Sequence, residues 1–111
     1  MSAKIQKDYQ EEVKQLVERV ITVYQPEKII AFGTTASGYV DEQSDIDLLV
    51  VKNTEKPFWE RVKDVLPLYD GFRSFDVSVL TPYELGQARE KGWYFITEEI
   101  LNKGKTLYER H

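Results

Sequence analysis

The chain has 111 residues with 41% hydrophobic and 31% charged residues, a net charge of −4 at pH 7 and no cysteine. This length and composition predict a single soluble globular domain over residues 1–111 and exclude disulfides and thiolate zinc sites. The negative charge argues against unaided binding to a phosphate backbone, so direct nucleic-acid binding is not expected.

The residue types also limit the metal chemistry and the location. The single histidine, His111, is the last residue, which leaves oxygen-ligand metals, chiefly Mg²⁺, Mn²⁺ or Ca²⁺. The sequence holds no apolar run near the roughly 20 residues that span a bilayer, so no membrane association is expected. The first 12 residues, MSAKIQKDYQEE, are polar and lack the apolar segment of a signal peptide, which favours a cytoplasmic protein.

The first half of the chain predicts a helix followed by two strands. Residues 4–24 carry apolar side chains at helical spacing, and Gln25-Pro26 is expected to end that helix. The apolar run 28–32 predicts a short buried strand that stops at Gly33. Residues 33–43 predict a polar turn with one helical turn inside it, and residues 45–52 predict the second strand.

The second half predicts three helices and two strands. Residues 58–66 predict a helix that ends at Pro67, with a buried stripe formed by Phe58, Val62, Val65 and Leu66. Residues 73–80 alternate as a half-buried strand with Asp76 on its exposed face. Thr81-Pro82 opens a helix over 83–89, residues 93–102 form another with Phe95 facing inward, and 105–109 form an edge strand. This order predicts an α+β fold: a small mixed sheet of three to four strands with helices mainly on one face.

Two aspartates open the second predicted strand. Asp45 and Asp47 lie two residues apart, so in a strand both side chains point to the same face, roughly 6.6 Å apart along the backbone. Asp76 completes a three-carboxylate cluster if its strand pairs beside the second. Such a cluster is unstable without cations, which predicts one Mg²⁺ ion, or two lying about 3.5–4 Å apart, and a triphosphate substrate. The alternatives are a turn or capping role for Asp45 and Asp47, and a solvated Asp76.

The segment 33–38, Gly-Thr-Thr-Ala-Ser-Gly, provides a second candidate feature. Glycine allows the backbone to approach a phosphate, while hydroxyls, amides and the start of a helical turn favour an anion. The segment matches the G-x₄-G part of a P-loop, but Tyr39 follows where lysine is required, and this excludes a P-loop.

Together these motifs resemble those of the minimal nucleotidyltransferases of the DNA polymerase β superfamily, small proteins often paired with a helical toxin. The resemblance is carried by Gly33-Thr34, Gly38, Ser44-Asp45-Ile46-Asp47-Leu48, Asp76 and the closing Gly104-Lys105-Thr106-Leu107-Tyr108-Glu109. The sequence differs from the usual family pattern at Thr34, where serine is usual, and at Thr35 and Ser37, where many members carry arginines. Phosphate binding is then expected from backbone amides, from metal, or from a distant base such as Lys52 or Arg73.

The resemblance implies a function and a set of site residues. Asp45, Asp47 and Asp76 would bind Mg²⁺, with Asp76 also a candidate general base, and ATP would be the substrate. Nucleotide binding is assigned to Gly33, Thr34, Ser37, Gly38 and Ser44. The chain would transfer AMP from ATP to a hydroxyl of a partner protein, a HEPN-type toxin, and act as its antitoxin.

Three alternatives stay open. The chain is either an active enzyme or a catalytically weak antitoxin that neutralises its partner by occlusion. Transfer to a small molecule is a third function, and it would require an acceptor pocket built by a homo-oligomer. We interpret four aromatic residues as core or partner-contact side chains, with a base-stacking platform as the alternative. They are Trp59, Trp93, Tyr94 and Phe95.

Overall fold

The computed structural model describes residues 3–111. Its elements in chain order are α1 (Ala3–Tyr24), β1 (Lys28–Ala31), α2 (Gly33–Ser37), β2 (Ile46–Val51), α3 (Phe58–Val65), the 3₁₀ turn η1 (Leu66–Leu68), β3 (Phe75–Leu80), α4 (Pro82–Glu90), the π-helix η2 (Phe95–Asn102) and β4 (Lys105–Glu109). Within this described range, no helix has the combination of length and apolarity that crossing a membrane requires.

The four strands form one mixed sheet in the order β3-β2-β1-β4. β1 is antiparallel to both β2 and β4, whereas β2 and β3 are parallel and are joined by a crossover through α3. The parallel pairing follows from this crossover, because parallel neighbours need a long connection between them. The predicted α+β fold with a mixed sheet of three to four strands is therefore confirmed.

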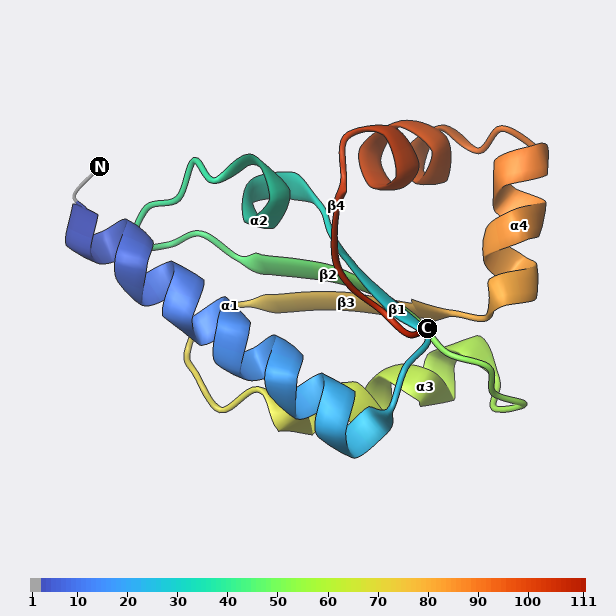
Figure 1. Cartoon of the computed structure of the whole chain (residues 1–111), viewed down its shortest axis with the longest axis horizontal. Coiled ribbons are helices and arrows are strands. Elements are labelled where there is room, and N and C mark those ends of the chain that lie inside the picture. Colours follow the sequence, from blue (N-terminus) through green and yellow to red (C-terminus); the bar gives the residue numbers. More distant parts are fainter. Residues whose placement is uncertain (1–2) are drawn as a thin grey trace.

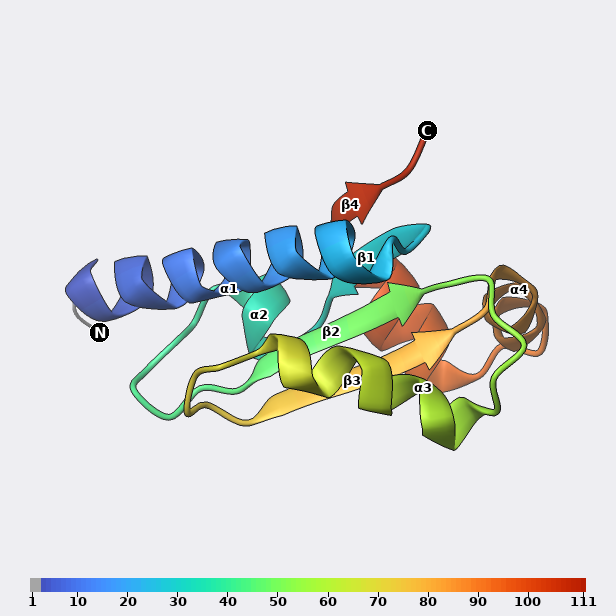
Figure 2. The ribbon, with the colours of Figure 1, turned by 90° about the horizontal axis from the view of Figure 1, so that it is seen from below.

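Helices lie on both faces of the sheet (Figures 1 and 2), so the prediction that they cover mainly one face is wrong. α1 and α3 cover one face, over the larger core cluster, which includes Leu16, Val20, Ile29, Ala31, Ile46, Leu48, Val50, Val65 and Val79. On the opposite face, α4 and η2 pack over a smaller cluster of Ile30, Leu49, Ala88, Ile96 and Ile100. α2 lies on this second face at the other end of β2 (Figure 1). The two ends of the second face thus carry helices, and the sheet between them carries the aspartates.

Two helices differ in detail from the prediction. Phe58, the first residue of α3, is 48% exposed, and Leu66, the first residue of η1, is also exposed, so the predicted buried stripe is wrong at these positions. Arg61 is buried instead, because its guanidinium donates hydrogen bonds to the backbone oxygens of Lys56 and Val79 and to the Glu84 carboxylate. The predicted stripe did not include Arg61.

The helix predicted over 93–102 is a π-helix that begins at Phe95. Its wider turns place Ile96 and Ile100 against the sheet and leave Phe95 about half exposed, so the prediction that Phe95 faces inward is wrong. The Phe95 ring packs edge-to-face on Phe32, with 5.3 Å between ring centroids. This contact links η2 to the residue that precedes α2.

Candidate functional site

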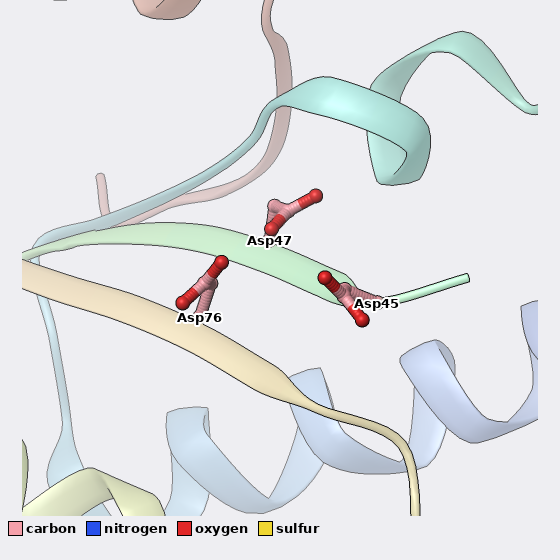
Figure 3. Close-up of side chains that lie close together, drawn as sticks. All are labelled: Asp45, Asp47 and Asp76. Carbon is pink, nitrogen blue, oxygen red and sulfur yellow. The ribbon is translucent and has the colours of Figure 1, made fainter. Parts of the chain in front are cut away.

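The three aspartates predicted to form a cluster lie together on the second face of the sheet (Figure 3). Asp47 and Asp76 are directly paired across the parallel β2–β3 ladder, and Asp45 immediately precedes β2. Each contributes a carboxylate oxygen, and the three oxygens lie within 4.8 Å of one another. The parallel register therefore produces the juxtaposition that the sequence pattern predicts.

Burial and neighbouring negative charges both disfavour ionisation of Asp47, the least exposed of the three. Burial, the charges of Asp76 and Asp45, and a hydrogen bond with Asp76 raise the pKa of Asp47 from 3.8 to about 6. Three convergent carboxylates are hard oxygen donors of the kind that Mg²⁺ prefers. The donor set and its mutual repulsion both fit a divalent cation, which Asp45, Asp47 and Asp76 would hold.

Gly33 brings the backbone of α2 next to this cluster. Its φ of +55° lies in the left-handed region, and a Cβ atom at this position would lie only 2.7 Å from Asp47 Oδ2. Any side chain here would therefore be strained and would collide with the carboxylate. Position 33, the first residue of the predicted phosphate-binding turn, therefore requires glycine, because the backbone here lies so close to Asp47, a predicted metal ligand.

Thr35 was not among the predicted site residues, but it holds α2 against β2. Its Oγ1 accepts a hydrogen bond from the backbone N–H of Asp47 at 2.8 Å and lies 2.7 Å from the hydroxyl oxygen of Tyr9. The Tyr9 hydroxyl donates to the backbone oxygen of Asp45 at 2.7 Å. A single network therefore joins α1 and α2 to the backbone of Asp45 and Asp47. The sequence holds no local signal for it, since Tyr9 and Thr35 are 26 residues apart.

The other residues assigned to nucleotide binding lie in or beside the glycine turn, and their contact with a nucleotide stays a prediction. Thr34 follows Gly33 in α2, and Gly38 ends that helix with a φ of +81°. The Ser37 hydroxyl donates to the Thr34 backbone oxygen at 3.4 Å. The Ser44 hydroxyl accepts a hydrogen bond from the Asp41 backbone N–H at 2.8 Å. These two hydroxyls therefore stabilise local turns.

The two distant bases considered for phosphate binding hold the scaffold instead. Arg73, whose side chain is 7% exposed, forms an ion pair with Glu12 at 3.1 Å and donates to the Ser44 backbone oxygen at 3.0 Å. Lys52 Nζ donates to the backbone oxygen of Tyr24 at 2.7 Å. Arg73 thus anchors the loop that leads into Asp45, and neither base offers a free cation to the aspartate cluster.

Comparison with protein-family models matches residues 11–111 to the family described as polymerase beta, nucleotidyltransferase. Among solved structures, the chain is similar to a crystal structure from Sulfolobus solfataricus that is provisionally assigned as a nucleotidyltransferase. The two share 22% sequence identity with a TM-score of 0.66, over 96% of this chain and 86% of the other. A likeness at this identity shows a shared fold. A search of curated proteins found no match.

Proposed function

The chain belongs to the polymerase β nucleotidyltransferase family, and on this premise we propose that it transfers AMP from ATP to a hydroxyl group of a partner protein. The observation that carries the proposal is the cluster of Asp45, Asp47 and Asp76 placed directly against the backbone of Gly33. The three carboxylates would bind the metal ion, and the adjacent glycine, which has no side chain, leaves room for a phosphate to approach the backbone.

The proposed reaction is a substitution at the α-phosphorus of ATP. The acceptor oxygen forms a bond to this phosphorus, the bond to the bridging oxygen of the pyrophosphate breaks, and pyrophosphate leaves. Asp76 is exposed on the edge strand β3, and it takes the proton of the attacking hydroxyl. When bound, Mg²⁺ would neutralise charge on the phosphates and on the three carboxylates. Gly33 and Thr34 would contact the phosphates through their backbone N–H groups.

A protein acceptor suits the dimensions of the chain. A chain of 111 residues with a net charge of −4 offers little basic surface for a nucleic-acid acceptor. The exposed Asp45 and Asp76 can be reached by a side chain of another protein. We infer that this partner is a small helical toxin of the HEPN type, and that modification by this chain neutralises it, which makes the chain an antitoxin that acts in the cytoplasm.

A second function, neutralisation by occlusion alone, is favoured by one specific observation. The glycine turn contains no basic residue, and the two candidate bases, Lys52 and Arg73, are occupied by backbone and carboxylate partners. A site with so little positive charge would bind triphosphate weakly. The chain would then inhibit its partner by covering it, without transferring a nucleotide.

Transfer of labelled AMP to the partner encoded beside this chain, with Mg²⁺ and ATP, tests the proposal. Asp45→Asn and Asp47→Asn should each reduce transfer by about 100-fold or more, because they remove charge that stabilises the metal and the transition state. Asp64→Asn is the matched control, since Asp64 lies on α3 across the sheet and pairs with Lys56 at the surface. An unchanged transfer rate in both site variants would refute the enzymatic proposal. Variants that lose transfer but still neutralise the toxin would favour occlusion.

A further inference from the structure

We propose that a cavity beside the aspartate cluster binds the nucleobase of the substrate nucleotide; this inference rests on the proposed function and gives it a base-binding site. The cavity has a volume of about 640 Å³ and lies between the sheet, α4 and η2. Its size falls within the range of small-molecule sites, roughly 300–1,000 Å³.

The floor of the cavity is formed by β2 and β3, the strands on which Asp47 and Asp76 lie. Leu49 and Ser78 line the cavity and are paired across β2 and β3, two residues after the pair Asp47 and Asp76. Residues two apart in a strand share a face and are separated by roughly 6.6 Å. The floor therefore begins about 7 Å along the strands from the pair Asp47 and Asp76, on the same side of the sheet.

The walls carry four aromatic side chains that are exposed to solvent. Trp93 is 57% exposed, and Phe58, Tyr83 and Phe95 are also exposed although each lines the cavity. Flat rings beside an apolar floor suit a nucleobase, because every base presents a π-face for stacking. Lys91 also lines the cavity, and its Nζ lies 5.6 Å from the Trp93 ring centroid, within cation–π distance.

The geometry of the proposed reaction places the nucleobase away from the position of the acceptor hydroxyl. α2, at the proposed pyrophosphate position, follows β1, and Asp76 lies on β3, so the line from the leaving group to the acceptor runs across the strands (Figures 1 and 3). In a phosphoryl displacement the attacking and leaving oxygens are roughly in line. The nucleoside therefore leaves this line sideways, either along the strands or away from the sheet. Along the strands, one direction leads past the exposed Asp45 to the end of the sheet, and the other leads into the cavity.

Two polar side chains in the lining can contact the edge of a base. Ser78 on the floor and Gln87 on α4 are both half-buried and line the cavity. A few polar groups within an apolar lining are typical of sites that orient a small ligand. A third polar residue, Glu84, is bound by Arg61 at 2.6 Å. The site therefore combines stacking surfaces with two side chains that can form hydrogen bonds to the base.

Fluorescence of Trp93 provides a direct test that does not depend on catalysis. The chain has two tryptophans, so Trp59→Phe leaves Trp93 as the single reporter. In the presence of Mg²⁺, ATP and adenosine should each quench Trp93, whereas inorganic tripolyphosphate should bind by calorimetry without quenching. Unchanged Trp93 emission up to millimolar ATP overturns the inference, whether or not calorimetry detects ATP binding. Quenching by a tyrosine peptide but not by ATP also overturns it and assigns the cavity to a protein acceptor.

Substitutions in the cavity give an independent test by calorimetry. Trp93→Ala and Ser78→Leu should each weaken ATP binding by about 10-fold, through lost stacking and a filled floor, and leave tripolyphosphate binding unchanged. Trp59→Ala is the matched control, because Trp59 is an exposed aromatic residue of α3 outside the cavity lining. Circular dichroism establishes that the variants fold. Equal ATP affinity in all of them overturns the inference.

The same measurements separate this inference from the proposed function. A chain that binds ATP against Trp93 but transfers no AMP retains the base site and refutes the transfer reaction. A chain that transfers AMP with the same KM for ATP in the wild type and in Trp93→Ala retains the reaction and refutes the base site.

Discussion

Asp47→Asn should stabilise the metal-free protein at neutral pH. The pKa of Asp47 rises from 3.8 to about 6 in the folded chain, a shift of about two units, and each unit corresponds to about 1.4 kcal/mol. A charged Asp47 therefore lowers the free energy of unfolding by up to about 3 kcal/mol above pH 7. Asparagine has the same shape without the charge, so we expect a gain of about 1–3 kcal/mol, or a rise in Tm of roughly 5–15 °C.

The sign of the pH dependence follows from the direction of the shift. Because the pKa of Asp47 is higher in the folded than in the unfolded chain, its proton stabilises the fold fully below about pH 4. This contribution is lost as the pH rises through about 6. The difference in stability between Asp47→Asn and the wild type should therefore grow between pH 4 and 6 and become constant above pH 7.

Thermal unfolding followed by circular dichroism in EDTA, from pH 4.5 to 8, measures this difference. Added Mg²⁺ should stabilise the wild type, by about 2.7 kcal/mol at 100 times its Kd, and should affect Asp47→Asn much less. Asp64→Asn, outside the cluster, controls for the loss of one surface carboxylate. An Asp47→Asn variant that is less stable than the wild type at pH 8 in EDTA, by an amount independent of pH, would refute the reasoning.

Three further predictions concern the same site. Lowering the pH from 8 to 5.5 should weaken Mg²⁺ binding measured by calorimetry, because the proton on Asp47 competes with the cation; pH-independent affinity would contradict this. Gly33→Ala should lower the free energy of unfolding by about 1–3 kcal/mol in urea, through its φ of +55° and its contact with Asp47. Gly86→Ala, which has open space at Cβ, should not destabilise the chain, and equal losses in the two variants would contradict the argument. Thr35→Val should cost about 1–3 kcal/mol in the same assay, because the Asp47 N–H loses its acceptor. Thr35→Ser should retain most of the stability, and an equal loss in both Thr35 variants would assign the effect to packing.

The sequence predicts the aspartate cluster well because two simple regularities produce it. Spacing of two residues places Asp45 and Asp47 on one face, and the alternation around Asp76 places it on the exposed face of a neighbouring strand. Once β2 and β3 pair in parallel, the observed register brings Asp47 and Asp76 side by side. Gly33 is similarly visible as the residue that ends an apolar run.

The supporting contacts were beyond sequence reasoning because they join distant parts of the chain. Arg73 contacts Glu12, which lies 61 residues earlier in the chain. Thr35 contacts Tyr9 through its hydroxyl, but in the sequence this threonine looks like any other polar residue of a turn. The exposed Phe58 and the buried Arg61 invert the usual preference, since Phe58 lines the cavity and Arg61 has carbonyl and carboxylate partners. Periodicity records residue type and spacing, and it contains no information on such partners.

The parallel register of β2 and β3 also limits how this site can change in evolution. A shift of one residue between the strands would turn Asp76 toward α1 and α3 and would place Val77 opposite Asp47. The same shift would expose Val77 and Val79, so the alternation that builds the core also protects the spacing of the carboxylates. Insertions in the exposed segment 70–72 leave this register unchanged, provided that Arg73 keeps the contacts that anchor the loop before Asp45. A single residue inserted between Phe75 and Asp76 would shift Asp76 away from Asp47 unless a β-bulge absorbed the change.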